Sequence, residues 1–193
     1  MRDEFGLIDG AESELMAGML KVTPLYETHQ QLGGRLIEFG GWEMPVQYAG
    51  IVDEHMAVRE AAGIFDISHM GEVMVAGPAA ERFLNRILTN DVTKLAPGNG
   101  HYSIMCNDDG GTIDDLYVYR QSALNFLLVI NASRIGEDVS WILKRFDEEP
   151  DRAGTHVFDV SSKYGAVAVQ GPAVRGFIDK CFDGGTLLSG PDD

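Results

Sequence analysis

The chain has 193 residues, 45% hydrophobic and 9% aromatic, which is enough for the core of one large domain or of one domain and part of another. Its 15 Lys and Arg against 30 Asp and Glu give a formal net charge of −15, and basic residues form no cluster. Nucleic-acid binding is therefore disfavoured. No apolar run approaches the roughly 20 residues that cross a bilayer, so we expect no membrane span.

The N-terminal segment 1–22 is acidic and turn-rich, and it lacks the basic region of a secretory signal. We interpret it as an extension that precedes the folded domain. The two cysteines, Cys106 and Cys181, are far apart in sequence and suggest neither a disulfide framework nor a CxxC metal site. These features favour a cytoplasmic, bacterial protein.

Globular patterning begins at Thr23. Thr-Pro at 23–24 predicts a helix over 23–32 with Pro24 at its first helical position. RLIEF (35–39) then predicts a short strand that ends at a Gly-Gly pair. Apolar residues recur at helical spacing in 50–63, where Gly63 is expected to end a helix.

Two more helices and three strands follow. The helices are predicted over 78–88, with Pro78 at the start, and over 133–146, where four apolar residues line one face: Ile135, Val139, Ile142 and Phe146. Strands are predicted over 71–77, 113–120 and 125–132, the last two as a hairpin.

An internal repeat sets the expected fold class. FDISHMGEVMVAGPAAERFL (65–84) aligns with FDVSSKYGAVAVQGPAVRGFI (158–178) after one inserted residue, and each copy reads as strand, Gly-Pro turn, helix. We predict an α+β fold in which a duplicated strand–helix unit forms a mostly antiparallel sheet covered by helices. The domain is expected to span 23–182, and the turn-rich 183–193 reads as a tail and a truncation point.

Asp114 and Asp115 are adjacent carboxylates at the start of an apolar, aromatic strand. Because successive strand side chains point to opposite faces, Asp115 shares a face with Tyr117 and Tyr119, and Asp114 lies on the other. An acid beside two tyrosines suits a flat, polar, heteroaromatic ligand. A solvent-facing strand edge or a capped turn is the structural alternative, and the pattern alone leaves both open.

No metal site is expected. The five histidines show no HxxxH or HExxH spacing. The turn at 107–111 lacks the alternating oxygen ligands and distal Glu of a calcium-binding loop.

Several long segments resemble the aminomethyltransferase of the glycine cleavage system, the T-protein. The resemblance runs almost unbroken from 23 to about 180. It rests on TPLYETHQQLGGRLIEFGGWEMPVQY (23–48), HMAVREAAGIFDISHMGE (55–72), LTNDVTKL (88–95), YSIMCNDDGGTIDDLYVY (102–119), VINASRIGEDVSWI (129–142) and VQGP (169–172). Members of this family are considerably longer, so the resemblance covers their N-terminal half.

The resemblance implies a tetrahydrofolate-dependent transferase. Such enzymes take an aminomethyl group from the lipoyl arm of a carrier, the H-protein, release ammonia, and form 5,10-methylenetetrahydrofolate. The expected partners are lipoylated H-protein and tetrahydrofolate, the one-carbon acceptor, with no metal, nucleic acid or membrane.

The resemblance also implies the site residues. Asp115 matches the second Asp of the family's GG-x-[IL]-D-D-L motif and is expected to be the key catalytic acid; Asp114 is left with a structural role. The expected folate-binding set is Met70, Tyr102, Asp115, Tyr119, Val129 and Asn131. We hypothesise that a partly buried Asp115 carboxylate orients the folate N5/N10 region and directs a proton.

The family's remaining pocket groups, including an Arg that holds the folate glutamate tail, lie in its later half. The 193-residue chain has no obvious counterpart of this Arg, which puts activity of the chain alone in doubt.

Three alternatives remain. A folate-dependent dehydrogenase domain or demethylase would come with a flavin domain or with altered SHMGE and DD segments, and neither holds here. A folate-binding relative that assists iron–sulfur maintenance would carry a Lys-Gly-Cys motif, which these residues lack. An inactive truncated fragment would show exposed apolar surface and no folate affinity.

Overall fold

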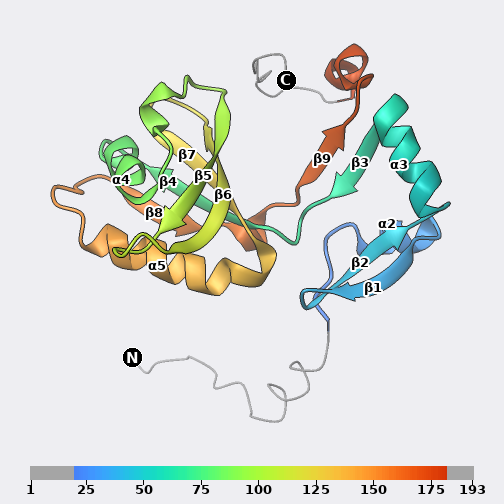
Figure 1. Ribbon diagram of the computed structural model, residues 1–193, viewed down its shortest axis with the longest axis horizontal. Coiled ribbons are helices and arrows are strands. Elements are labelled where there is room, and N and C mark those ends of the chain that lie inside the picture. The colour runs from blue at the N-terminus through green and yellow to red at the C-terminus, as the bar shows by residue number, and fades with distance from the viewer. Residues whose placement is uncertain (1–19, 182–193) are drawn as a thin grey trace, which may run out of the picture. The chain divides into compact units, whose positions relative to one another are not determined.

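The computed structural model describes residues 20–181 and divides into two compact units, one ending at Tyr48 and the other beginning at Ala49 (Figure 1). Most of the expected N-terminal extension and all of the expected tail lie outside the described residues. Within 20–181, no helix has the length and apolar character needed to cross a membrane.

The first unit is a helix with a two-stranded hairpin. Strands β1 (Arg35–Phe39) and β2 (Trp42–Gln47) pair antiparallel through Gly40 and Gly41, whose φ angles of 59° and 85° suit a tight hairpin loop. β1 has its predicted bounds. β2 was not predicted; it contains Pro45, which a strand tolerates at a sheet edge.

The helix of this unit, α2 (Tyr26–Gln31), begins later than predicted. The Thr23 hydroxyl accepts a hydrogen bond from the Leu25 amide at 3.3 Å, and the Tyr26 amide bonds the Thr23 carbonyl at 3.1 Å. Thr23 to Tyr26 therefore forms a turn, and Pro24 lies before the helix instead of at its first position.

The second unit contains a five-stranded antiparallel sheet in the order β5-β6-β7-β4-β8. Its strands are β4 (Gly71–Ala76), β5 (Gly100–Cys106), β6 (Thr112–Arg120), β7 (Asn125–Ile130) and β8 (His156–Asp159). The predicted β6–β7 hairpin is confirmed, whereas β5 and β8 were not recognised as separate strands. The sheet and its helices confirm the α+β class.

Helices α4 (Ala80–Ile87) and α5 (Ile135–Asp147) pack on one face of this sheet (Figure 1). Pro78 precedes α4 instead of opening it. The apolar face predicted for α5 is confirmed: Ile142 is fully buried, and its other three members pack against the core. The fully buried core residues include Phe83, Leu84, Val73, Val75, Leu128 and Ile130.

Three short 3-10 helices follow elements of this sheet or its helices: η1 (Val92–Lys94), η2 (Ala132–Arg134) and η3 (Ser161–Lys163).

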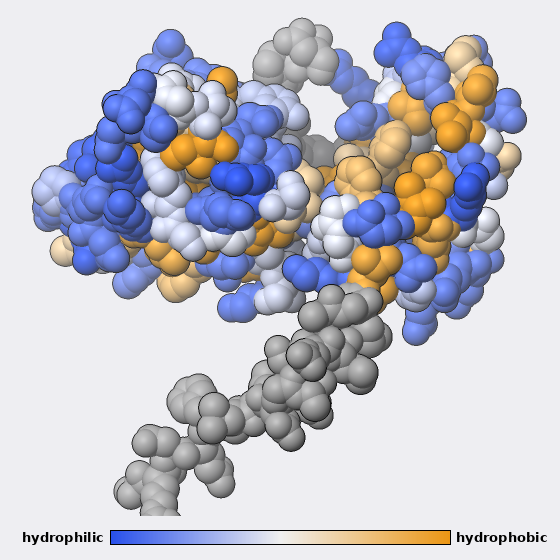
Figure 2. Space-filling model, turned by 60° about the horizontal axis from the view of Figure 1, so that its bottom comes forward, coloured by the Kyte–Doolittle hydropathy of each residue, from blue (hydrophilic) through white to orange (hydrophobic). Residues whose placement is uncertain are grey.

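The same unit contains α3 (Ile51–Glu60) and a second, two-stranded sheet of β3 (Gly63–Asp66) and β9 (Val167–Gln170). Gly63 opens β3 and does not end α3, which stops at Glu60. The apolar positions of α3 are open to solvent, with Ile51 62% and Val52 72% exposed. Figure 2 shows hydrophobic side chains gathered over the elements outside the five-stranded sheet.

The two copies of the repeat exchange strands. The first copy supplies β3 and β4 and the second supplies β8 and β9, yet β3 pairs with β9 and β4 pairs with β8, all antiparallel. Gly77 and Gly171 end β4 and β9 with φ angles of 129° and 136°. After the second Gly-Pro the chain forms η4 (Val174–Gly176) and η5 (Ile178–Lys180), so the α-helix predicted for the second repeat copy is wrong.

Candidate functional site

The face of β6 opposite the helices carries the acid and the tyrosines. Leu116 and Val118, with exposed fractions of 2% and 0%, point into the core. The strand alternation places Asp115, Tyr117 and Tyr119 on the opposite face, as predicted from the sequence.

The strand register extends this face across the sheet. Tyr102 of β5 is opposite Tyr117, which in turn is opposite Val129 of β7. The Tyr102 and Tyr117 rings meet edge to face with centroids 5.0 Å apart, and the Tyr117 and Tyr119 centroids are 4.6 Å apart. The result is a continuous aromatic surface of three rings, referred to below as the tyrosine row.

The Tyr117 and Tyr119 rings lie where a side chain at position 100 would be, so this position must be glycine. A Cβ atom there would lie 2.5 Å from Tyr117 Cε1 and 2.7 Å from Tyr119 Cδ1, closer than carbon atoms approach. Gly100 is opposite Tyr119 in the β5–β6 register, so its missing side chain leaves the room that the two rings occupy.

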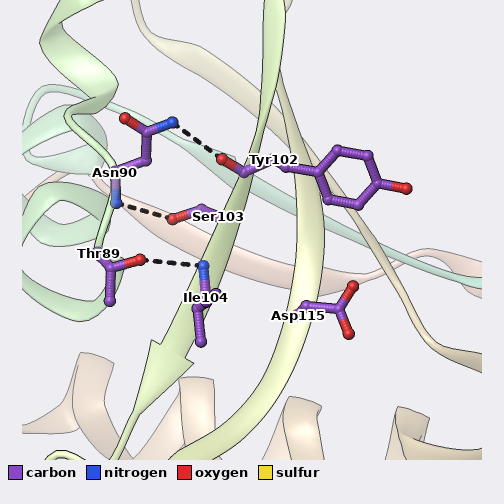
Figure 3. Close-up of a pocket in the computed structure, with 6 residues that line it drawn as sticks. All are labelled: Thr89, Asn90, Tyr102, Ser103, Ile104 and Asp115. Atoms are coloured by element: carbon purple, nitrogen blue, oxygen red, sulfur yellow. Dashed lines mark hydrogen bonds between the residues drawn. The ribbon is translucent and has the colours of Figure 1, made fainter.

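A surface hollow of about 480 Å³ adjoins the tyrosine row (Figure 3). It is lined by Thr89, Asn90, Tyr102, Ser103, Ile104 and Asp115. Figure 3 shows the Tyr102 ring and the Asp115 carboxylate projecting toward the same side of the strands. Tyr102 is 68% exposed, so its ring is available to a ligand.

The segment after α4 fixes β5 at the hollow. Asn90 Nδ2 donates to the Tyr102 carbonyl at 2.9 Å, the Asn90 amide donates to Ser103 Oγ at 3.0 Å, and the Ile104 amide donates to Thr89 Oγ1 at 3.2 Å. These three bonds hold the backbone that carries the Tyr102 ring.

Asn131, which directly follows β7, is a close polar neighbour of Asp115 on this face. Asn131 Nδ2 donates to the Asp115 carbonyl oxygen at 3.0 Å and lies 3.5 Å from Asp115 Oδ1. Asp115 itself is exposed, so the expectation of a partly buried carboxylate is wrong for this chain. The hollow is open on this side, which leaves the carboxylate accessible.

The remaining residues of the expected set lie around the same face. Val129 of β7 is opposite Tyr117, and Tyr119 follows Tyr117 by two residues on β6. Met70 lies in the turn that leads from β3 into β4, and its amide bonds the Ile67 carbonyl at 3.0 Å. The register thus brings Tyr102, Asp115, Tyr119, Val129 and Asn131 to one face and leaves Met70 at the entry of a neighbouring strand.

Tyr117 was not in the expected folate-binding set, and Thr89 and Asn90 were not assigned a role from the sequence. Tyr117 was placed on the correct face, but its central position in the tyrosine row follows only from the β5–β6–β7 register. Thr89 and Asn90 belong to LTND (88–91), a polar break after a helical pattern, and this break was the one available signal.

Two buried carboxyl groups belong to neighbouring elements, Glu72 to β4 and Asp138 to α5. Burial and the nearby Asp159 raise the pKa of Glu72 to about 7; burial and Asp114 raise the pKa of Asp138 to about 7. Glu72 is opposite Val129, and Asp138 lies in the first turn of α5. In residues 20–181 no three or more His, Cys, Asp or Glu side chains gather in a manner suited to a metal ion.

Comparison with known proteins identifies the family. Residues 25–187 match the family model described as the GCVT N-terminal domain. The chain belongs to this family. Its identity to the aminomethyltransferase of Desulforamulus reducens is 47% over 161 residues, covering 83% of this chain and 43% of that protein. Its identity to the Bacillus subtilis aminomethyltransferase is 46% over 165 residues, covering 86% and 44%.

A solved structure supports the fold of the family. The Bartonella henselae glycine cleavage system aminomethyltransferase T superposes with a TM-score of 0.75 at 36% identity, covering 86% of this chain and 45% of that one. The chain therefore spans less than half the length of the relatives it matches.

Proposed function

We propose that the chain supplies the Asp115 side of the folate site of an aminomethyltransferase in glycine cleavage. The donor is the aminomethyl group on the lipoyl arm of H-protein, and the acceptor is tetrahydrofolate. Support comes from the family membership, from the names of its relatives, and from the accessible acid beside the tyrosine row.

The reaction transfers one carbon without a change in oxidation state. The C–S bond to the lipoyl arm and the C–N bond to the departing ammonia break, and two C–N bonds to folate N5 and N10 form. The two folate N–H protons leave with the thiol and with ammonia. A carboxylate beside the reacting nitrogens accepts their hydrogen bonds and directs these protons.

The reaction needs an acceptor for the folate N–H groups, which Asp115 provides, and a surface for the flat ring, which the tyrosine row provides. This juxtaposition is the observation that carries the proposal. An ionised carboxylate only accepts hydrogen bonds, so it suits the N–H groups of a reduced pterin. The flat ring packs against Tyr102 and Tyr117, where each aromatic contact contributes about 0.5–1.5 kcal/mol. Val129 and Asn131 border the same face.

Calorimetric titration of the 193-residue chain with tetrahydrofolate tests the proposal. We expect saturable binding that Asp115→Ala weakens at least ~10-fold, because the substitution removes a charge-assisted hydrogen bond of about 1.5–3 kcal/mol. Asp109→Ala is the matched control, since Asp109 is another exposed acid, in the turn before β6. The melting temperatures of both variants should stay close to that of the parent chain.

The activity itself is measured as ammonia and methylenetetrahydrofolate formed from aminomethylated H-protein. Loss of a group that directs a proton lowers the rate by roughly 10²–10⁴-fold. Absence of tetrahydrofolate binding, or equal binding by the parent chain and the Asp115→Ala variant, would contradict the proposal. Folate binding without transfer would instead favour the folate-binding relative that assists iron–sulfur maintenance.

A further inference from the structure

A chain of polar side chains connects the buried helix α5 with the open face of the sheet. Asp138 on α5 is fully buried, neither oxygen of its carboxyl group has a hydrogen-bond partner within residues 20–181, and the nearby carboxyl group of Asp114 on β6 raises its pKa. Asn131 Nδ2 then donates to Asp114 Oδ1 at 3.0 Å. The same Nδ2 bonds the Asp115 carbonyl oxygen at 3.0 Å and lies near Asp115 Oδ1.

Two ionised carboxylates cannot hydrogen-bond each other. A carboxylate accepts hydrogen bonds and donates none, and within residues 20–181 no donor reaches either oxygen of Asp138 or Oδ2 of Asp114. Buried acceptors without a donor are costly, and two facing anions repel as well. One proton placed between the carboxyl groups provides the donor and removes one of the charges.

The surrounding charges favour this proton on balance. Burial, the neighbouring Asp114 carboxyl group and the charge of Glu137 all raise the pKa of Asp138, and only Arg134 lowers it. Arg134 belongs to the short helix η2 directly before α5, and Glu137 is exposed in the first turn of α5. The resulting pKa of about 7 keeps the proton bound up to neutral pH.

We propose that Asp138 and Asp114 share one proton and act as positioning residues for Asn131 and, through it, for Asp115. With the proton present, the Asp138 hydroxyl donates to Asp114 Oδ2, which keeps Asp114 Oδ1 as a fixed acceptor for Asn131. The Asn131 amide then faces the start of β6 in one orientation. Loss of the proton leaves two facing anions, which move apart and release Asn131.

The consequence for Asp115 rests on the proposed function, whereas the shared proton does not. Asp115 is exposed, so packing does not fix its carboxylate, and the contact of Asp115 Oδ1 with Asn131 Nδ2 links it to the body of the sheet. A carboxylate that acts on a reacting nitrogen must be held in place, and displacement by about 1 Å is costly.

Nuclear magnetic resonance of the 193-residue chain tests the shared proton directly. We expect the carboxyl carbon of Asp138 to titrate near neutral pH, and the Asn131 side-chain amide signals to shift with the same midpoint. In Asp138→Asn, whose amide donates at every pH, the Asn131 shift should disappear. In Glu137→Gln, the matched control one residue away, it should remain.

Two results would overturn the proposal: an unchanged Asn131 titration in Asp138→Asn, or no titration of the Asp138 carboxyl carbon around neutral pH. Because Asp138→Leu removes the donor at similar volume, its Asn131 signals should differ from those of the parent chain even in acid. If Asp138→Asn is less stable than the parent chain, the test still holds, because the Asn131 amide signals are read from the folded fraction.

Tetrahydrofolate titrations separate this proposal from the proposed function. If the parent chain binds tetrahydrofolate, its affinity should fall several-fold as the Asp138–Asp114 proton is lost, and Asp138→Asn should lose this pH step. An Asn131 titration without folate binding would keep the shared proton and reject the proposed function. Folate binding without an Asn131 titration would reject the shared proton alone.

Discussion

Ser68 and Ser161 occupy equivalent positions in the two repeat copies, and each hydroxyl bonds the backbone of the other copy. The Ala166 amide donates to Ser68 Oγ at 3.0 Å, and the Glu72 amide donates to Ser161 Oγ at 2.9 Å. Since Glu72 aligns with Ala166, the two bonds are the same contact made twice. The serines thus mark a local two-fold relation between the copies, which the crossed pairing of β3 with β9 and β4 with β8 repeats.

Removing either hydroxyl should destabilise the second unit. We expect Ser68→Ala and Ser161→Ala each to lower the free energy of unfolding by about 1–3 kcal/mol, because a partly buried amide loses its acceptor. Urea denaturation measures this. Ser140→Ala is the control: Ser140 is exposed on α5 and bonds only the Gly136 carbonyl of its own helix, so the change should stay within about 0.5 kcal/mol. Equal losses in all three variants would count against the cross-copy bonds.

The Gly-Pro turns offer a second test. Gly77 has a φ of 129°, and a Cβ atom there would run into the Gly154 carbonyl oxygen and the Thr155 backbone. Gly77→Ala should therefore cost about 2–4 kcal/mol, from backbone strain together with the clash. Gly136→Ala in α5 faces open space and should stabilise by up to about 1 kcal/mol. Thermal unfolding of the two variants should show shifts of opposite sign; a stable Gly77→Ala chain would contradict the turn geometry.

The crossed pairing of the repeats could not be predicted from the sequence, and the reason is physical. A strand pattern shows which side of the strand is buried, but not which other strand it pairs with, because each copy offers the same apolar strands. β5 was missed because GHYSIMC mixes a glycine and polar residues with apolar ones. Its buried Ser103 is satisfied by the Asn90 amide, a contact between distant segments.

The β6 face was predictable, whereas the residues that support it were not. Alternation alone separates Asp114 from Asp115, and this needs no tertiary information. Asp114 raises the pKa of Asp138, which lies in a different element and reads in sequence as one of two acids at a helix start, a common favourable feature. Only the packing of α5 on the sheet shows that Asp138 is buried.

The buried carboxyl of Glu72 should make stability depend on pH. Its folded pKa is raised to about 7 by burial and Asp159, so the folded state holds its proton over a range where the unfolded state has lost it. The stability that this bound proton contributes to the folded state is full in acid, falls as the pH rises through about 4.5 to 7, and is lost above that range. Glu72→Gln should thus match the parent chain at about pH 4.5 and exceed its stability at about pH 8, on the order of 1–3 kcal/mol.

Urea unfolding at these two pH values measures the Glu72 effect. Glu60→Gln is the matched control, because it removes one negative charge from the exposed end of α3. It accounts for any gain that comes only from lowering the net charge of −15. If both variants gained equally at the higher pH, burial of Glu72 would not be the cause.

Glu149 should be the strongest ion-pair position of the described residues. Its carboxylate is 1% exposed, accepts a hydrogen bond from Arg82 Nε at 2.9 Å, and forms an ion pair with Arg86 Nε at 2.9 Å. Glu149→Ala should cost about 1–3 kcal/mol, less than a fully buried pair, because both arginines remain partly solvated. Lys94→Ala breaks the exposed pair with Asp91, 3.8 Å apart, and should change stability by under about 0.5 kcal/mol. Comparable costs in the two variants, measured by denaturation, would contradict the role of burial.

Tyr117 is the position at which the tyrosine row can be broken without touching the acid. Its ring contacts both Tyr102 and Tyr119, so Tyr117→Leu removes two aromatic pairs and Tyr117→Phe keeps both. With about 0.5–1.5 kcal/mol for each aromatic contact, we expect Tyr117→Leu to weaken tetrahydrofolate binding by roughly 5–20-fold and Tyr117→Phe to weaken it little. Tyr164→Leu, an exposed tyrosine after η3, controls for loss of a surface ring. Calorimetry decides the point: a loss in Tyr117→Phe as large as in Tyr117→Leu would assign the effect to the hydroxyl group and not to the aromatic surface.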